Sequence, residues 1–135
     1  MRERIFMDSS FWILLRDDKG PEYGRIVEVT RRLLCNRGQL VVTELVLAET
    51  HAYFCRSPLR SLQILDDFEN NRALHCEPTA PSDQQEAFQL LRRQRDKTWS
   101  FCDAISFAVM RRLGIRKAAA ADHHFRQFGE FEIIC

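Results

Sequence analysis

The chain has 135 residues, of which 45% are hydrophobic and 29% charged, a composition and length typical of one globular domain, so we expect a single domain over residues 1–135. With 20 Lys and Arg against 19 Asp and Glu, net charge alone indicates no partner. We expect no membrane span or signal peptide, because no apolar run is long enough. Five cysteines without a C-x-x-C pair predict reduced thiols in a cytoplasmic protein.

The first half of the chain alternates between apolar runs and segments of helical periodicity. In order, it predicts a strand at residues 5–7, helices at 11–15 and 22–36, a strand at 40–42 and a helix at 44–54. Residues 16–21 read as an exposed turn with Gly and Pro. We expect Gly38 to end the second helix in the C-terminal position that favours glycine. Thr43 is placed to cap the third helix.

The second half continues this alternation. It predicts a helix at residues 58–70, a short strand at 74–76, helices at 82–94 and 100–113, and strands at 117–121 and 131–134. Ser100 suits the N-terminal cap of the helix predicted at residues 100–113, and Gly114 suits its C-terminal end. Strands that alternate with helices favour an α/β fold, in which helices cover both faces of a mainly parallel sheet. In such sheets ligands bind outside the carboxyl ends of the strands.

Four acidic residues stand where a fold would not need them: Asp8, Glu49, Asp103 and Asp122. Asp8 and Asp122 each follow a predicted strand, which places both at the carboxyl edge of the sheet. Either one also suits a simple capping role. Asp103 lies on an apolar helix face, but it also completes an S-x-x-D capping box with Ser100.

Glu49 is harder to explain as a structural residue. On a helical wheel it falls between Leu45 and Tyr53, with Ala48 and Ala52 beside it, in the middle of an apolar arc. We therefore expect this carboxylate to turn inward. The alternative is a salt-bridged or snorkelling acid at the edge of the core.

Together the four acids predict a metal site. Buried carboxylates are unfavourable unless they are paired or bound to a cation, and four of them would repel one another. Mg²⁺ and Mn²⁺ prefer oxygen ligands and promote in-line attack at phosphate. We assign metal coordination, direct or through water, to Asp8, Glu49, Asp103 and Asp122. One of them would also orient or deprotonate the attacking water.

Several neighbours of these acids allow two interpretations. His123 and His124 follow Asp122 and suit either metal ligands and proton carriers or exposed side chains. Ser10, with Ser9, suits a supporting contact to a ligand carboxylate or phosphate. Thr43 suits the same contact, although capping fits it better.

Two sets of aromatic and basic residues also allow two interpretations. Trp12 and Trp99 suit base stacking, but also packing in the core or a dimer interface. The arginine clusters in residues 31–32, 92–95 and 111–112 suit RNA backbone contacts, while solvated helix faces explain most of them as well.

At these residues the chain resembles the PIN-domain ribonucleases and, among them, the VapC-type toxins. Residues 5–10 resemble the first acidic motif of the family, 43–49 the second and 96–106 the third. Residues 121–125 resemble the fourth, an aspartate followed by two variable residues and phenylalanine. The motifs occur in family order and span almost the whole chain.

The resemblance implies a three-layer α/β/α sandwich with a mainly parallel sheet of about five strands. It implies an endoribonuclease that needs Mg²⁺ or Mn²⁺, with an RNA substrate and Asp8, Glu49, Asp103 and Asp122 as its acids. In the toxin branch it also implies a homodimer and a type II toxin–antitoxin pair, in which the tail of a small antitoxin enters the acidic cleft. Cys102 departs from the family, whose members often carry Thr or Ser there.

Other functions compatible with this pattern are a PIN-like RNA-processing module and a non-catalytic module that binds RNA or a partner. Phosphatase or DNA nuclease activity at the same acids is a lesser variant. A phospho-receiver domain fits poorly, because it needs an acidic pair after the first strand and an aspartate after the third. Here Asp8 is followed by two serines, and no aspartate follows residues 74–76.

Overall fold

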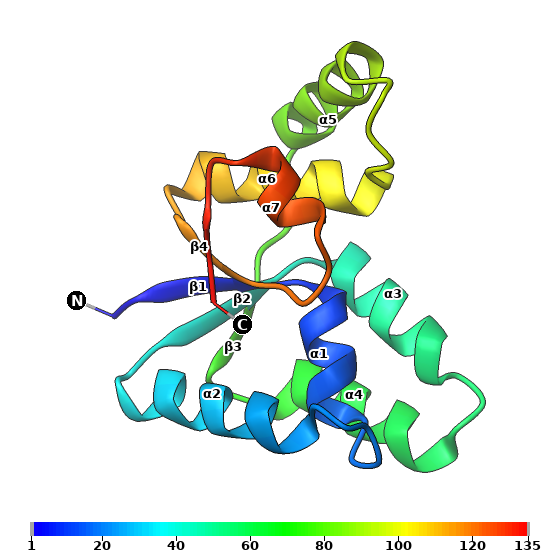
Figure 1. The fold of residues 1–135 in the computed structure, drawn as a ribbon, viewed down its shortest axis with the longest axis vertical. Coiled ribbons are helices and arrows are strands. Elements are labelled where there is room, and N and C mark those ends of the chain that lie inside the picture. Colours follow the sequence, from blue (N-terminus) through cyan, green and yellow to red (C-terminus); the bar gives the residue numbers. More distant parts are fainter. Residues whose placement is uncertain (1, 135) are drawn as a thin grey trace.

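Five parallel strands form the centre of the molecule in the order β3-β2-β1-β4-β5 (Figure 1). The computed structural model describes residues 2–134. Its strands are β1 (Arg4–Met7), β2 (Gln39–Val42), β3 (Leu74–Cys76), β4 (Lys117–Ala119) and β5 (Glu132–Ile133). The predicted parallel α/β sheet is therefore confirmed. The strand order differs from the 2-1-3-4-5 order of receiver domains, which excludes that alternative.

The strand order creates a switch point between β1 and β4. From β1 the chain moves outward through β2 to β3, and it then returns to place β4 on the other side of β1. Met7 pairs with Ala119 at the carboxyl ends of these two strands, and the Asp8 N–H donates to the Ala119 carbonyl at 3.0 Å. In an open α/β sheet this is where a ligand crevice forms, and Asp8 lies directly at it.

Helices cover both faces of the sheet. They are α1 (Ser9–Arg16), α2 (Tyr23–Cys35), α3 (Glu44–Phe54), α4 (Pro58–Asn70), α5 (Pro81–Arg93), α6 (Phe101–Leu113) and α7 (His124–Phe128). The first four contact one another on one side, whereas α6 contacts α5 and α7 on the other. Figure 1 shows α5 projecting away from the sheet above α6. The three-layer α/β/α architecture implied by the resemblance is thus confirmed.

The end of α2 differs from the sequence prediction. Arg37, not glycine, adopts the left-handed conformation, with a φ of 59°. Gly38 follows it and donates its N–H to the Leu33 carbonyl at 2.9 Å. A Cβ on Gly38 would lie 2.6 Å from that carbonyl oxygen. Glycine is therefore required here for a close backbone approach and not for a positive φ.

An aromatic cluster packs α6 against α7 and the segment before α6. Phe107 of α6 stacks on Phe128 at 4.3 Å between ring centroids and meets Phe125 edge-on at 4.9 Å. Trp99 packs edge-on against Phe107 at 5.4 Å and is buried. Trp12 is fully buried as well. Both tryptophans therefore pack in the core, and neither is available for base stacking.

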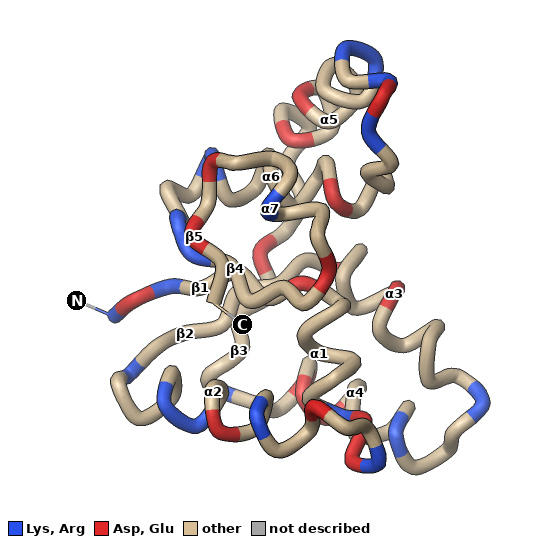
Figure 2. Tube along the Cα trace, viewed as in Figure 1, with Lys and Arg blue, Asp and Glu red and all other residues tan. Residues whose placement is uncertain are grey.

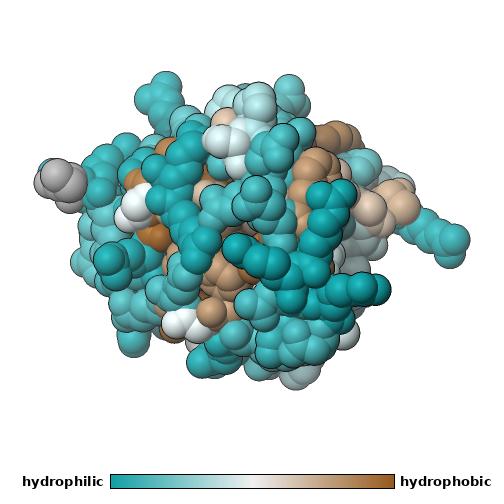
Figure 3. Space-filling model, turned by 90° about the horizontal axis from the view of Figure 1, so that it is seen from above, coloured by the Kyte–Doolittle hydropathy of each residue, from teal (hydrophilic) through white to brown (hydrophobic). Residues whose placement is uncertain are grey.

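On the face that Figure 3 shows, apolar areas occur as separate patches. Figure 3, which views the molecule from above, shows them between hydrophilic side chains. Within residues 2–134, none of the helices combines the length and the apolar character that crossing a bilayer requires.

Candidate metal centre

Asp8 lies at the junction of β1 and α1, and its carboxylate is only half satisfied. It caps α1, because the Ser10 N–H and hydroxyl donate to Asp8 Oδ2 at 3.2 and 2.6 Å. The other oxygen, Oδ1, is buried and has no hydrogen-bond partner among the described residues. Burial raises the pKa of Asp8 to about 7; Asp122 and Asp103 add to this effect, and the Ser10 hydrogen bonds oppose it. Capping therefore explains one oxygen and leaves the other without a structural role.

Asp103 lies in the first turn of α6 and forms the predicted capping box. Its Oδ2 accepts a hydrogen bond from the Ser100 N–H at 3.0 Å, and its own N–H donates to the Ser100 hydroxyl at 3.0 Å. The residue is buried, and burial raises the pKa of its carboxyl, opposed first by the Ser100 backbone hydrogen bond. The cap holds the side chain in place while it remains part of the acidic cluster.

Asp122 and His124 complete a tight group with Asp103. The His124 N–H donates to Asp122 Oδ1 at 3.0 Å. The imidazole Nδ1 of His124 lies 3.0 Å from Asp103 Oδ2 and 3.6 Å from Asp122 Oδ2. One potential ligand atom from each of these three residues falls within 4.8 Å of the others. His123 is exposed and is not a member of this group.

Glu49 reaches the site from α3, but not from the buried face that we predicted. The residues of α3 that face the core are Val46, Thr50 and Phe54. Tyr53, expected beside Glu49 on the inward arc, is 63% exposed, and Glu49 itself is half-buried. The prediction was wrong because apolar residues occur on all sides of α3, so periodicity alone does not identify its inward face.

Two side chains hold Glu49 at the rim. The Ser9 hydroxyl donates to Glu49 Oε1 at 2.7 Å, and the Cys102 thiol also hydrogen-bonds to this carboxylate. Burial raises the pKa of the Cys102 thiol, with Glu49 next in effect, so the sulfur stays protonated as a donor. Cys102, at the position where the chain departs from the family resemblance, therefore presents a protonated thiol to Glu49.

These side chains surround a cleft of about 660 Å³ at the carboxyl ends of β1 and β4. Its lining includes the polar residues Ser9, Ser10, Glu49, Tyr53, Ser100, Asp103, Asp122 and His124. In Figure 2, acidic positions from separate segments lie around this region between the two helical layers. Asp8 underlies the cleft beside Ser9 and Ser10. All four predicted acids thus come from distant parts of the sequence to one region.

Ser10 and Thr43 differ in their relation to the cleft. The Ser10 hydroxyl donates to Asp8 and also accepts from the Ala121 N–H at 2.9 Å, so it ties the end of β1 to the segment that carries Asp122. Thr43 is fully buried and caps α3, where its hydroxyl accepts the Val46 N–H at 3.3 Å. It does not line the cleft and affects Glu49 only through the start of the helix.

The buried acids of the cleft differ from the other buried acids of the described chain in having no arginine partner, and this bears on whether a cation fits the site. Asp67 accepts from Arg16 Nε at 2.7 Å, and Asp83 pairs with Arg112 at 3.0 Å. Within residues 2–134, neither Asp8 nor Asp103 has a Lys or Arg partner. Carboxylate oxygens without a cationic side chain, together with the orphaned Asp8 Oδ1, form a donor set that suits a hard divalent ion.

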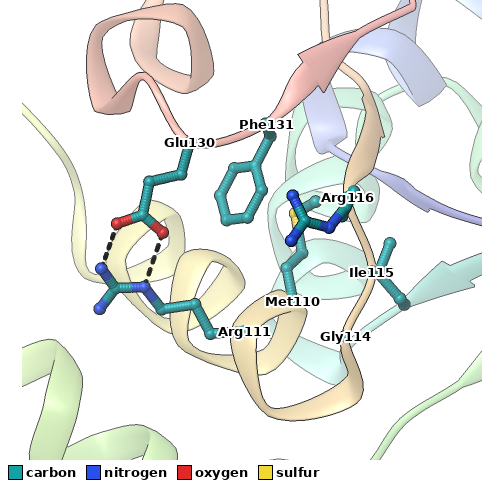
Figure 4. A pocket seen from close by; sticks show the side chains of 7 residues that line it. All are labelled: Met110, Arg111, Gly114, Ile115, Arg116, Glu130 and Phe131. Carbon is teal, nitrogen blue, oxygen red and sulfur yellow. Dashed lines mark hydrogen bonds and ion pairs between the residues drawn. The ribbon is translucent and has the colours of Figure 1, made fainter.

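A second hollow, of about 370 Å³, lies at the opposite edge of the sheet, next to the amino end of β4. Figure 4 shows it between Met110, Ile115 and Phe131, with the Arg111–Glu130 pair at its side. The carboxylate of Glu130 is already bound by Arg111 Nε at 2.8 Å. This hollow therefore offers no free acidic cluster, and the cleft at the switch point remains the candidate site.

Comparisons with known proteins place the chain in a family. A sequence model of the PIN domain matches residues 5–130. The 23S rRNA-specific endonuclease VapC20 of Mycobacterium tuberculosis, from two strains, is 30% identical over 131 residues, which cover 96% of this chain and 97% of the relative. The crystal structure of that protein, described as a Sarcin-Ricin loop cleaving toxin, matches with a TM-score of 0.83 at 28% identity over 97% of this chain and 99% of that one.

Two more distant structures share the fold. DNA-bound VapBC complexes from Rickettsia felis and Salmonella typhimurium match with TM-scores of 0.69 and 0.68 at 13% and 14% identity. The chain therefore belongs to the PIN domain family. Its function is that of a VapC-type toxin ribonuclease, an endonuclease.

Proposed function

We propose that this protein is a Mg²⁺- or Mn²⁺-dependent endoribonuclease and that Asp8, Glu49, Asp103 and Asp122 hold the cation. The observation that carries this proposal is the buried Asp8 Oδ1, which has no partner among the described residues and lies close to Asp103 and Asp122. A buried carboxylate oxygen without a donor is unfavourable, and a cation in the cleft would satisfy it.

The chain's own residues would hold this site in a fixed arrangement. Ser10 fixes one oxygen of Asp8 and binds the backbone after β4, while Ser9 and Cys102 fix Glu49. Ser100 fixes Asp103 through the cap. When bound, the cation would lower the pKa of a coordinated water and neutralise charge on the phosphate under attack.

We infer the partners from the relatives. The closely matching mycobacterial protein is 23S rRNA-specific, so a structured loop of ribosomal RNA is the substrate we propose for this chain. The VapBC structures support a small antitoxin partner, and the toxin branch supports a homodimer. We place the enzyme in the cytoplasm with its RNA, and we propose that residues 1–135 work as one PIN domain.

RNA cleavage by purified protein tests the proposed function. We expect wild type to cleave 23S rRNA in Mg²⁺ or Mn²⁺, and Asp8→Asn and Asp103→Asn to lose at least about 100-fold in rate, because each removes a ligand. Asp66→Asn, at an exposed aspartate of α4, is the matched control and should retain full activity. Circular dichroism would establish that each variant is folded.

Two outcomes would contradict the proposal. Full activity in either ligand variant would exclude the acids from catalysis. Binding of RNA without cleavage by wild type, in either metal, would favour the alternative of a PIN-like RNA-processing or non-catalytic binding module.

A further inference from the structure

His124 places a nitrogen atom in an otherwise oxygen-rich cluster. Its Nδ1 lies 3.0 Å from Asp103 Oδ2 and 3.6 Å from Asp122 Oδ2. The side chain is 22% exposed, and its position is fixed from two directions. The backbone N–H of His124 donates to Asp122 Oδ1, and the next residue, Phe125, is fully buried. The imidazole therefore points at the acids because the backbone on both sides is held.

A second observation shows that this cluster needs a ligand. Asp8 Oδ1 is buried without a partner in the described part of the chain, and the residue is 1% exposed. Asp8 is close enough to Asp103 and Asp122 for their charges to raise its pKa, although burial is the larger cause. The unsatisfied oxygen therefore belongs to a carboxylate that lies beneath the cleft and is influenced by Asp103 and Asp122, the two acids of the His124 group.

The separations suit simultaneous coordination. Two neighbouring ligands of an octahedral ion at about 2.1 Å lie about 3 Å apart. The distances from Nδ1 to the two carboxylate oxygens, 3.0 and 3.6 Å, are close to this value. Small movements of the half-buried His124 and Asp122 side chains would bring all three atoms to one ion.

We propose that His124 Nδ1 is a direct metal ligand that makes the site favour Mn²⁺ over Mg²⁺. The inference rests on the proposed metal-dependent function and adds a nitrogen ligand to its four acids. Mg²⁺ prefers oxygen ligands almost entirely, whereas imidazole suits transition metals, and affinity for nitrogen rises along that series. An imidazole among carboxylates therefore adds more to the binding of Mn²⁺ than of Mg²⁺.

The competing explanation is that His124 only pairs with Asp103 and Asp122 and leaves when a cation arrives. The neighbouring His123 supplies a matched control, since it is the same residue type, is exposed, and has its ring centroid 4.6 Å from that of His124. If His124 is a ligand, replacing it must remove nitrogen from the metal, whereas replacing His123 must not.

Pulsed electron paramagnetic resonance of bound Mn²⁺ tests the proposal directly. We expect imidazole nitrogen coupling in wild type and in His123→Asn, and its loss in His124→Asn. Protein labelled with ¹⁵N-histidine should shift the wild-type coupling, which shows that the nitrogen ligand is a histidine, and the His123→Asn variant then excludes the neighbouring ring. By calorimetry, His124→Asn should lower the ratio of Mn²⁺ to Mg²⁺ affinity by roughly 10-fold, while His123→Asn leaves it unchanged.

The outcomes separate this inference from the proposed function. One outcome is that Mn²⁺ binds wild type without histidine coupling and that Asp8→Asn abolishes this binding. The His124 assignment is then overturned, and the four-acid site stands. If wild type binds no Mn²⁺ at all, both are overturned. Retention of the coupling in His124→Asn would also exclude His124.

Discussion

At the scale of single residues, the buried acids of the described chain fall into two groups, those paired with arginine and those without an arginine partner. Asp67 and Asp83 are satisfied by arginines, so they contribute to the packed fold. Asp8 keeps one oxygen without a partner, which costs about 1–3 kcal/mol in the metal-free protein. A residue retained at such a cost is typical of a functional site, where stability is lost in exchange for a pre-formed ligand position.

The pKa of Asp8 predicts how metal-free stability depends on pH. Burial raises this pKa from 3.8 to about 7, so the folded protein binds the proton more tightly than the unfolded chain. The stabilisation that protonated Asp8 gives to the folded protein is complete below the pKa of Asp8 in the unfolded chain. It is lost as the pH rises through about 7, the pKa in the folded protein. The raised pKa of Asp103 acts in the same direction.

We therefore expect the Tm measured with a chelator to fall between about pH 4 and pH 7, and Asp8→Asn to reduce this fall because it removes the titrating group. Thermal melts at several pH values measure both, with Asp66→Asn as the control that should follow wild type. The same pH dependence in wild type and Asp8→Asn would contradict the assignment.

At the scale of elements, α7 positions the last two side chains of the cluster. Phe125 is fully buried and contacts Phe6 and Phe107, at ring separations of 6.2 and 4.9 Å. This phenylalanine of the fourth family motif anchors the segment from Asp122 to His124. The short helix itself was not predicted, because five residues contain too little periodicity for a helical pattern.

Removing this anchor should destabilise the protein. We expect Phe125→Ala to lower the free energy of unfolding by about 3–5 kcal/mol, since it leaves a cavity in the core. Denaturant unfolding measures the loss. Phe101→Ala is the control, because Phe101 is 39% exposed and should lose clearly less. Equal losses in the two variants would show that Phe125 is not a core anchor.

The end of α5 carries cations that differ from those of α2. Arg31 and Arg32 of α2 both pair with Glu28. Among the described residues, no ion pair with an acid is found for Arg93 or Arg95. Arg93 is the last residue of α5 and Arg95 follows it in the turn, and Figure 2 shows basic positions gathered at this end of the helix. Cations without acidic partners are available to RNA phosphates.

We expect the double variant Arg93→Gln, Arg95→Gln to weaken RNA binding and to reduce its salt dependence by about one unit of slope per lost phosphate contact. Binding assays at several salt concentrations measure this. The double variant Arg31→Gln, Arg32→Gln removes the same charge from α2 and serves as the control. If both pairs weaken binding equally, the effect is one of net charge and not of a surface on α5.

Much of this element structure could be predicted because caps and breakers mark it locally. Ser100 starts α6 and Gly114 ends it, as expected from their residue types. Other features depend on tertiary packing, which local pattern does not contain. The inward face of α3 is one example, since its apolar residues surround the helix. The contact between Cys102 and Glu49 is another, because it joins two helices.

At the scale of the whole molecule, the strand order creates the site. β4 returns beside β1, and only this places the segment of Asp122 next to Asp8. The alternation of strands and helices predicts a parallel sheet but not the order of its strands. The convergence of the acids could be expected from strand ends and from family resemblance. The sequence left His123 and His124 open between ligands and exposed side chains, and only the three-dimensional arrangement shows that His124 alone of the two lies beside the acids.

The anomalous scattering of Mn²⁺ in a crystal soaked with that ion is the most direct test of the central claim that distant acids form one cation site. We expect a peak in the switch-point cleft, with oxygens of Asp8, Asp103 and Asp122 within about 2.0–2.6 Å and Glu49 bound directly or through water. A fully soaked crystal with no peak in this cleft, or with Mn²⁺ only at exposed acids elsewhere, would contradict the account.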